Sequence, residues 1–226
     1  MKLVFIISIS ISFLFFQDEY AGLRHQMVET QIKARGVSDN NVLKSMKKVP
    51  RHLFVPSSYQ SVAYSDRPLP IGQSQTISQP YIVGYMTEAI HPKKDDVVLE
   101  IGTGSGYQAA VLAEIVKEVY TLEIIPELGR MAKERLEILG YENIHAKVSD
   151  GYYGWSEFAP FDAIVVTAAA EQIPEPLIEQ LAEGGRMIIP VGPAFDIQNL
   201  VLVTKINGKV KVKKLFAVRF VPFTRD

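Results

Sequence analysis

The chain has 226 residues, a formal net charge of −1 and no cysteine. This length suits one domain with small additions, and the near-neutral charge predicts neither nucleic-acid nor membrane-surface binding. The lack of cysteine excludes disulfides, thiolate nucleophiles and cysteine-ligated metals. The four histidines, His25, His52, His91 and His145, lie far apart in the sequence, so we expect no metal site.

The first residues differ from the rest. Lys2 precedes a run from Leu3 to Phe16 that contains only Leu, Val, Phe, Ile and Ser. The run is short for a membrane span and fits the apolar part of a secretory signal, although no small-residue cleavage site follows it. We therefore interpret residues 1–16 as a leader, either a signal or an anchor. The alternative is an upstream extension that is not always translated, since Met27 is a second possible start.

Residues 17–226 are predicted to form a single domain, whose first part, residues 17–95, is a helical preface. Apolar periodicity predicts a helix over 18–35 and a second one before Pro50, capped by Ser38 or Asp39. Residues 64–79 show no clear period. Pro80 then suits the first turn of a helix that runs to about residue 90.

Strands and helices alternate through the second part, residues 96–226. The sequence predicts strands at 97–101, 119–122, 144–148, 161–166 and 186–190, and helices at 107–116, 127–139 and 174–182. Asn207-Gly208 is a strong hairpin signal between strands at 200–205 and 209–218. The fold class is therefore α/β: a doubly wound, mostly parallel sheet with a C-terminal antiparallel hairpin.

The glycine-rich segment Gly102-Thr103-Gly104-Ser105-Gly106 joins the first strand of this series to a helix. Glycines suit places where a chain turns tightly and a ligand touches the backbone. Tyr107 stands where the dinucleotide fingerprint has its third glycine, and the segment has no lysine for a phosphate-binding loop. The remaining candidate ligand carries a nucleoside and an amino acid without a pyrophosphate, which describes S-adenosyl-L-methionine. A purely structural turn is the alternative.

Two carboxylates follow the next two predicted strands. Glu123 ends the second strand, where a carboxylate can accept both ribose hydroxyls of a nucleoside. Asp150, before Gly151, follows the third strand, where a carboxylate can receive an adenine amino group. The alternatives are a solvated glutamate and an ordinary Asp-Gly turn. Because parallel strands end at one edge of the sheet, these groups are expected to lie together.

Several longer motifs carry a family resemblance from about Met27 to Thr224. They are Val49-Pro50-Arg51-His52-Leu53-Phe54-Val55-Pro56, Leu69-Pro70-Ile71-Gly72, Gln75-Thr76-Ile77-Ser78-Gln79-Pro80-Tyr81, the segment from Glu100 to Gly106, Pro160-Phe161-Asp162-Ala163-Ile164 and Val218-Arg219-Phe220-Val221-Pro222. With these motifs the chain closely resembles the protein-L-isoaspartate O-methyltransferase family. The resemblance implies S-adenosyl-L-methionine as methyl donor, S-adenosyl-L-homocysteine as product and no metal.

By this resemblance the enzyme methylates the free α-carboxylate of isoaspartyl residues in damaged proteins and peptides, which starts their repair through a succinimide. Ser78 is then the active-site residue, and Thr76 and Ile77 line the junction of substrate and cofactor. The implied cofactor residues are Gly102, Glu123, Asp150, Gly151 and, near the cofactor, Thr224. Two positions depart from the usual family pattern, with Ser74 and Ser149 where glycine is common.

The chemistry limits the role of Ser78. A carboxylate with a pKa near 4 is already an anion at neutral pH, so it needs no general base to attack a methyl sulfonium. We expect the Ser78 hydroxyl to hydrogen-bond or orient the substrate carboxylate and not to act as a nucleophile. The alternative is a helix cap for the segment that begins at Pro80, and both roles are compatible.

Other functions remain open at this stage. A methyltransferase of the same fold with another substrate, a cofactor-binding module without turnover, and a nicotinamide-dependent oxidoreductase are the rivals; Tyr107 argues against the last. We expect isoaspartyl proteins as partners, no nucleic acid and a monomer. The family resemblance and the cofactor supply indicate the cytoplasm, whereas residues 1–16 indicate export or membrane tethering.

Overall fold

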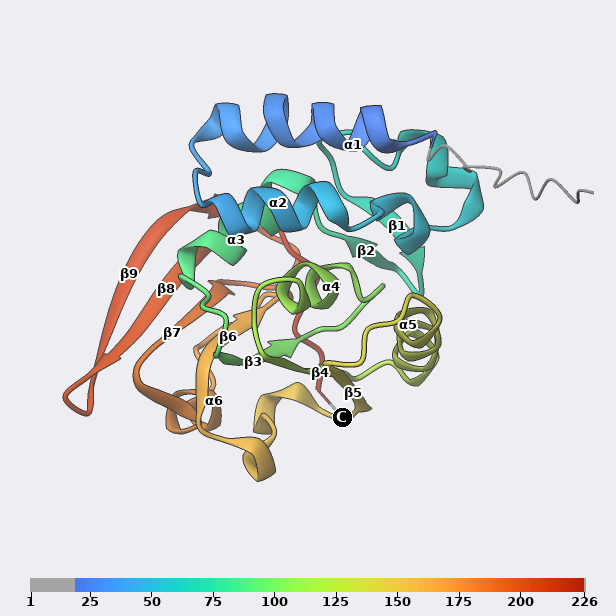
Figure 1. Cartoon of the computed structure of the whole chain (residues 1–226). Helices are drawn as coiled ribbons and strands as arrows, with labels where there is room; N and C mark the ends of the chain where they lie inside the picture. Colours follow the sequence, from blue (N-terminus) through green and yellow to red (C-terminus); the bar gives the residue numbers. More distant parts are fainter. Residues whose placement is uncertain (1–18, 226) are drawn as a thin grey trace, which may run out of the picture.

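A central seven-stranded sheet organises the structure, a computed structural model that describes residues 19–225 (Figure 1). The strand order is β5-β4-β3-β6-β7-β8-β9. The strands are β3 (Val97–Ile101), β4 (Glu118–Glu123), β5 (Ile144–Val148), β6 (Phe161–Val166), β7 (Leu181–Val191), β8 (Gln198–Ile206) and β9 (Lys209–Val218). β3 to β7 pair in parallel, and β8 and β9 continue the sheet antiparallel. The predicted α/β fold with a C-terminal antiparallel hairpin is confirmed.

Side chains of the central strands pack alternately into two cores, as the period of two in a strand requires. Val98 and Val165 belong to one core, and Leu99 and Ile164 to the other. The first core is covered by the helices that precede β6: α1 (Ala21–Met27), α2 (Asn40–Lys48), α3 (Pro80–Ala89), α4 (Tyr107–Ala113) and α5 (Pro126–Ile138). The second is covered by α6 (Glu175–Glu179), which lies on the opposite side of the sheet in Figure 1.

The N-terminal preface is helical, as predicted, but the first helix is not uniform. α1 continues into a π-helical segment, η1 (Val28–Ile32), and a 3₁₀ turn, η2 (Lys33–Arg35), before Gly36 ends the run with φ 100°. Asp39 caps α2, because its carboxylate accepts hydrogen bonds from the N–H groups of Asn41 and Val42. Two 3₁₀ segments, η3 (Arg51–Phe54) and η4 (Ser57–Val62), lead to the sheet region.

The segment without a clear period contains a small hairpin that the sequence did not reveal. β1 (Leu69–Gly72) pairs antiparallel with β2 (Gln75–Ile77). The turn residues Gln73 and Ser74 both have positive φ, 51° and 55°, the pattern of the primed turns that suit two-residue hairpins. Periodicity does not predict these strands, because the segment is rich in proline and polar residues and each strand has only three paired residues.

Two other predicted boundaries were wrong. α6 is shorter than the expected helix at 174–182, and β7 begins at Leu181, well before residue 186. The glycine pair expected as a turn before the strand lies within β7, where the pairing jumps from Phe161–Leu181 to Ala163–Arg186. A bulge therefore absorbs these residues, which periodicity does not reveal. Two short 3₁₀ segments, η5 (Gly151–Tyr153) and η6 (Ser156–Phe158), connect β5 to β6.

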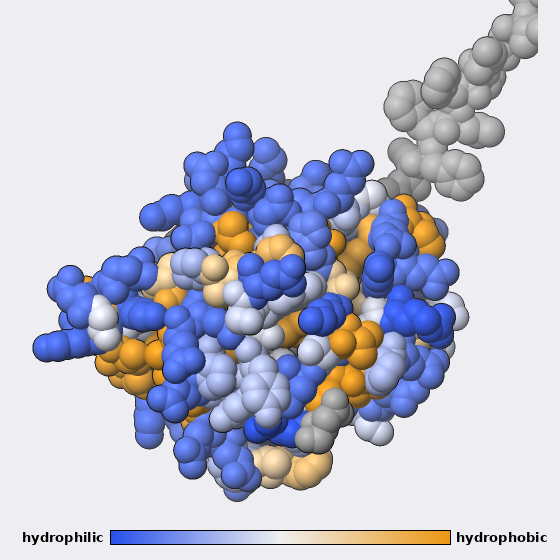
Figure 2. Space-filling view, turned by 90° about the horizontal axis from the view of Figure 1, so that it is seen from below, coloured by the Kyte–Doolittle hydropathy of each residue, from blue (hydrophilic) through white to orange (hydrophobic). Residues whose placement is uncertain are grey.

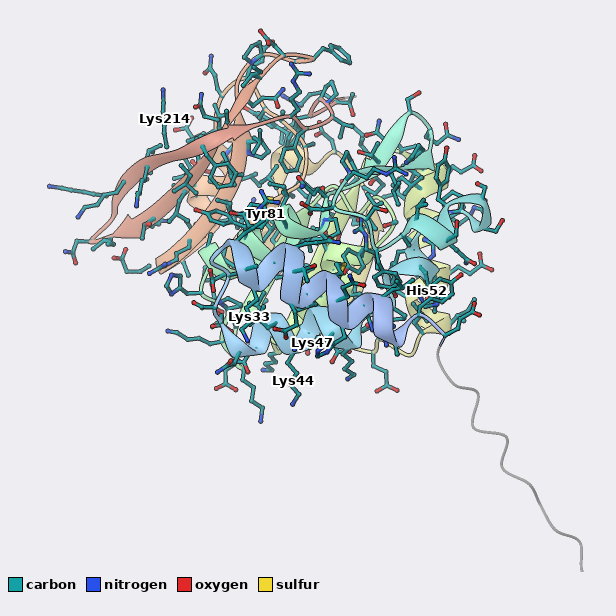
Figure 3. All side chains as sticks on the ribbon, turned by 90° about the horizontal axis from the view of Figure 1, so that it is seen from above. Lys33, Lys44, Lys47, His52, Tyr81 and Lys214 are labelled. Carbon is teal, nitrogen blue, oxygen red and sulfur yellow. The ribbon has the colours of Figure 1, made fainter. Side chains whose placement is uncertain are left out.

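The hairpin of β8 and β9 projects beyond the body of the molecule (Figure 1). Asn207 and Gly208 form its turn with φ 53° and 68°, as their sequence predicts. Residues 209–214 are exposed on both faces of β9. Figure 3 shows Lys214 on the outer side of this strand and Tyr81 between the strand and the N-terminal helices. From below, the surface is mostly hydrophilic with small separate hydrophobic patches (Figure 2).

The leader proposed for residues 1–16 lies outside the described residues. Among residues 19–225, none of the helices combines the length and the apolar composition that a membrane crossing needs. In the same part of the chain, acidic and histidine side chains do not gather in threes around a possible metal position.

Candidate active site

The glycine-rich turn lies at the carboxyl end of β3, beside the end of β6. Gly102 and Gly104 have φ of 94° and 53°, which L side chains rarely adopt. At Gly102, a side chain would also collide with the Thr167 hydroxyl. That hydroxyl donates to the carbonyl oxygens of Gly102 (2.7 Å) and Ile101 (3.0 Å). The turn thus exposes backbone at the sheet edge. The hydrogen bonds from Thr167 fix its conformation on the other side.

Glu123 closes the other side of this turn. Its side chain is 5% exposed. One carboxylate oxygen accepts a hydrogen bond from the Gly104 N–H at 2.7 Å, and the other accepts from the Ile125 N–H at 3.0 Å. Each carboxylate oxygen has a further lone pair for a ligand hydroxyl. The residue predicted to bind a ribose therefore also shapes the turn that would bind the rest of the ligand.

A network of buried, hydrogen-bonded side chains packs against the glycine-rich turn. The Thr121 hydroxyl donates to the Glu100 carboxylate at 2.5 Å and lies 2.7 Å from the hydroxyl of Thr103. Thr103 is therefore a structural member of the turn. Burial raises the pKa of Glu100 to about 8, with a further contribution from Glu123, so Glu100 is mainly protonated at neutral pH. Keeping it neutral avoids a second negative charge beneath the cofactor edge.

Asp150 and Gly151 lie at the end of β5, as predicted. The Asp150 carboxylate caps η5 by accepting from the Tyr152 N–H at 2.9 Å, and it accepts from Arg225 Nε at 3.0 Å. The Arg225 guanidinium also lies 3.6 Å from the centroid of the Tyr152 ring. Gly151 packs so closely on Ile101 that a side chain there would collide with it. Arg225, from the C-terminal segment, therefore packs against the end of the sheet at β5.

Gly102 and Gly104 of the turn, Gly151 and Glu123 lie around a first cavity at the edge of the sheet. The lining residues are Gln75, Thr76, Ile101, Gly102, Gly104, Leu122, Glu123, Ile124, Ile125, Gly151, Thr167, Ala168, Val221, Pro222, Phe223 and Thr224. The structure thus brings together five of the predicted cofactor residues. Thr103, Ser105, Gly106 and Asp150 do not line the cavity but lie directly behind or beside it.

A second, larger cavity of about 640 Å³ opens next to the first. Its residues are Arg35, Pro68, Thr76, Ser78, Gln79, Tyr81, Ile82, Thr167, Ile197, Phe216, Ala217, Val218, Arg219, Phe220 and Val221. Three residues, Thr76, Thr167 and Val221, line both cavities. They form a shared wall, and a ligand in one cavity would meet a ligand in the other at this wall.

The predicted substrate residues divide between this cleft and the core. Thr76 and Ser78 line the cleft, whereas Ile77 is 4% exposed and packs in the hydrophobic core. This alternation follows from β2, in which neighbouring side chains point to opposite faces. The helix-cap alternative for Ser78 is wrong: the residue before α3 is Gln79, and no side chain caps that helix.

A cation and an aromatic ring form part of the cleft wall. The Arg35 guanidinium carbon lies 3.5 Å from the centroid of the Tyr81 ring, and Arg35 forms a 2.7 Å ion pair with Asp66. The Tyr85 ring links this wall to Phe216 of β9, with ring centroids 4.8 Å apart. Asp66 thus balances the charge of Arg35, and the residue forms part of the cleft wall.

Sequence reasoning missed several of these site residues. Thr167 directly follows β6, so the rule that ligands bind at the ends of parallel strands would have found it. Tyr81, Val221 and Pro222 were noticed only as members of family motifs. Arg35 and Tyr81 come from the helical preface, and no local signal shows that this segment folds against β9.

Comparison with known proteins decides the family. A family model described as protein-L-isoaspartate(D-aspartate) O-methyltransferase matches residues 23–226. The chain belongs to this family. The resemblance seen in the motifs is therefore confirmed, and the family model extends over nearly all of the described residues.

Relatives named protein-L-isoaspartate O-methyltransferase align over most of their own length. One from Picosynechococcus sp. is 58% identical over 92% of this chain and 93% of its own. One from Opitutus terrae is 58% identical over 90% of this chain and 87% of its own, and one from Gloeobacter violaceus is 58% identical over 88% and 98%. The similarity therefore includes both the helical preface and the sheet.

Solved structures agree with the fold. A structure named protein-L-isoaspartate O-methyltransferase has a TM-score of 0.80 and 32% identity, covering 88% of this chain and 65% of that chain. This chain thus spans slightly less than two thirds of that structure. A Plasmodium falciparum protein, solved in complex with S-adenosyl-L-homocysteine, has a TM-score of 0.75 and 27% identity over 90% of this chain and 99% of its own.

Proposed function

We propose that this protein transfers a methyl group from S-adenosyl-L-methionine to the free α-carboxylate of L-isoaspartyl residues in proteins and peptides. The observation that carries the proposal is the shared wall of Thr76, Thr167 and Val221 between the two cavities. A methyl transfer needs its donor and acceptor in contact but separately bound. The open cleft beside Ser78, of about 640 Å³, has room for a polypeptide. The first cavity, the inner one, is only about 60 Å³ and suits a nucleoside ligand by its chemistry, since glycine backbone and the Glu123 carboxylate line it.

The residues of the inner cavity fit S-adenosyl-L-methionine. Gly102 and Gly151 both line the cavity, and neither has room for a side chain, so they present only backbone to a ligand. Glu123 supplies a buried carboxylate with spare lone pairs for two ribose hydroxyls. We assign cofactor contacts to Gly102, Gly104, Glu123, Gly151 and Thr224, which line the cavity. The Plasmodium falciparum relative was solved in complex with S-adenosyl-L-homocysteine, the product of this cofactor, which supports a ligand of this kind for the present chain.

Asp150 is proposed to receive the adenine amino group, although it lies beside the cavity lining. Both of its oxygens already accept hydrogen bonds, from Tyr152 and from Arg225. A carboxylate has about four acceptor positions, so these contacts leave room for a further donor. Arg225 would then fix the orientation of this acceptor.

The substrate chemistry requires alignment and no general base. A carboxylate is ionised at neutral pH because its pKa is near 4. When bound, S-adenosyl-L-methionine supplies an electrophilic methyl group on a sulfonium. Among the described residues that line the two cavities there is neither a histidine nor a lysine. Ser78 and Thr76 offer neutral hydroxyl donors, which orient the carboxylate without holding its ground state too strongly.

The methyl transfer needs no reactant besides the carboxylate and the methyl donor. A carboxylate oxygen forms a bond to the methyl carbon as the carbon–sulfur bond breaks, and the electron pair of that bond remains on sulfur. Later, away from the enzyme, the neighbouring backbone nitrogen attacks the ester carbonyl and methanol leaves. The resulting succinimide takes up water and returns in part to normal aspartate. Water exclusion and alignment at the shared wall can supply about 7–11 kcal/mol of the barrier reduction.

A pair of matched peptides tests this function. One peptide contains an isoaspartyl residue, and its twin has normal aspartate at the same position. With methyl-labelled cofactor, we expect label in the isoaspartyl peptide alone, released later as methanol. Equal labelling of both peptides would support a methyltransferase with another specificity. Cofactor binding in calorimetry without any labelling would support a binding module and overturn the proposal.

We further propose that the protein acts as a monomer on polypeptide substrates in the cytoplasm, where its cofactor is made. Size-exclusion chromatography with light scattering tests the first point. N-terminal sequencing of the native protein from separated cell fractions tests the second, because removal of residues 1–16 in an exported fraction would contradict a cytoplasmic location.

A further inference from the structure

Arg51 heads the group of largest fully buried side chains in the described chain, with an exposed fraction of 0%. Arginine is rarely buried unless an acidic partner balances it. None of the ion pairs between described residues includes Arg51. Burial lowers the pKa of Arg51 to about 10, and nearby Tyr107, Tyr64 and Asp66 offset only part of this effect. Because a buried cation without an ion-pair partner destabilises the fold, its hydrogen bonds must offset part of that cost.

Arg51 donates hydrogen bonds to two backbone carbonyls from separate segments. Its Nε donates to the carbonyl oxygen of Ala63 at 2.7 Å, and its Nη2 donates to that of Ser78 at 2.8 Å. Hydrogen bonds from a charged donor are roughly twice as strong as neutral ones. Both ends of the segment 63–78 are therefore held by one side chain. This segment includes the β1–β2 hairpin and Thr76.

The third neighbour of Arg51 belongs to the cofactor side of the site. Its guanidinium carbon lies 4.9 Å from the centroid of the Tyr107 ring. Tyr107 is 1% exposed and is the first residue of α4, directly after the glycine-rich turn. One fully buried side chain therefore reaches from the backbone of Ser78 to the helix that begins beside the cofactor cavity.

We infer that Arg51 is a positioning residue, which sets Ser78 and Thr76 at a fixed distance from the glycine-rich turn. It lines neither cavity, so it acts through Ser78 and not on the substrate. The inference rests on the proposed function, because it assumes that Ser78 meets the substrate. The planar fork of arginine suits this task, since its donors point in fixed directions toward two carbonyls. Lysine presents a single ammonium on a flexible stem and does not reproduce the fork.

Arg51→Lys tests the inference, with Ser45→Ala as the matched control. Ser45 is 2% exposed and donates to the Val111 carbonyl at 2.6 Å, so its variant loses a buried hydrogen bond without a contact to Ser78. Removal of the Ser78 hydroxyl is expected to lower kcat roughly up to tenfold, and a residue that acts through Ser78 can cost no more than this. We therefore expect Arg51→Lys to reduce kcat by up to about tenfold, with little change in the cofactor Kd, and Ser45→Ala to reduce only thermal stability.

A double-mutant cycle separates positioning from general loss of structure. If Arg51 acts through Ser78, Arg51→Lys has a much smaller effect on kcat when Ser78→Ala is already present. Equal fold-losses in both backgrounds would overturn the inference, as would an Arg51→Lys variant with the kcat of Ser45→Ala. A wild-type protein that does not methylate the isoaspartyl peptide would instead contradict the proposed function.

A measurement on the wild-type protein covers the case in which Arg51→Lys does not fold. With ¹⁵N-labelled arginine, the Arg51 Nε–H is expected to exchange slowly with solvent and to shift when isoaspartyl peptide and S-adenosyl-L-homocysteine are added. Arg130 of α5 is exposed and lines neither cavity, so it serves as the internal reference for fast exchange. An Arg51 signal that exchanges as fast as that of Arg130, or that does not shift when the peptide is added, would overturn the inference.

Discussion

The carboxylate of Glu123 accepts a 2.7 Å hydrogen bond from the backbone N–H of Gly104. One buried acid at the end of β4 therefore holds the glycine-rich turn that follows β3. The expected ribose contact and the shape of the turn depend on the same side chain. A substitution at this position is expected to act on ligand binding through both effects.

Replacing Glu123 with alanine is expected to weaken cofactor binding first. Loss of a hydrogen bond to a charged group costs about 1.5–3 kcal/mol, or roughly a 10- to 100-fold rise in Kd. Glu123→Gln keeps one acceptor oxygen and should fall between wild type and Glu123→Ala in calorimetry. Glu127→Ala, at an exposed position in the first turn of α5, is the control. An unchanged Kd for Glu123→Ala would contradict the assignment.

Ser78→Ala is expected to lower turnover and leave cofactor binding nearly intact. The variant removes one neutral hydrogen bond to the substrate carboxylate, worth about 0.5–1.5 kcal/mol or roughly up to tenfold in kcat. Methyl transfer and calorimetry, run on the same preparation, separate the two effects. Ser57→Ala, in the exposed start of η4, should change neither quantity. Equal losses of turnover and cofactor affinity would rule out a role limited to the substrate.

Ser74→Gly is expected to stabilise the protein. Ser74 has φ 55° in the two-residue turn between β1 and β2, and left-handed backbone costs a non-glycine residue about 1–2 kcal/mol. Glycine removes this strain but loses more chain entropy, so we expect a net gain of about 0.5–1 kcal/mol in urea unfolding. The same change at Ser61, inside η4, should destabilise the protein. A gain at both positions would show that local backbone strain is not the cause.

Glu100→Gln is expected to flatten the dependence of stability on pH. Burial raises the pKa of Glu100 from 4.5 to about 8. Between these values the folded protein keeps a proton that the unfolded chain has lost, so rising pH destabilises the wild type by up to about 1.4 kcal/mol per unit. The loss begins near pH 4.5 and ends near pH 8. Urea unfolding of both proteins from pH 5 to 8.5 checks this, and parallel curves would refute it.

Periodicity and capping residues predicted the parts of the fold that are locally encoded. The strands at 144–148, 161–166 and 209–218 have the predicted bounds, and Asp39 caps α2 as expected. The β1–β2 hairpin was missed because both strands are short and β1 contains a proline. β7 was predicted too short because its glycine pair sits in a bulge, a feature set by pairing with β6 and not by local sequence.

The candidate site was predictable where it follows the ends of parallel strands. Gly102, Glu123 and Gly151 line one cavity because β3, β4 and β5 end at the same edge. Ile77 shows the limit of motif reasoning, since its side chain packs in the core between two cleft residues. The buried position of Arg51 was not predicted, because a charged residue is expected at the surface. Its contacts are long-range and have no sequence period.

The shared wall of Thr76, Thr167 and Val221 joins parts of the chain that are far apart in sequence. A ligand that touches all three binds only the folded protein and shifts its folding equilibrium by mass action. At a free concentration 100 times its Kd, such a ligand adds about 2.7 kcal/mol to the free energy of unfolding. A higher free concentration of cofactor is therefore expected to lengthen the lifetime of this enzyme against proteolysis as well as to raise its rate of methyl transfer.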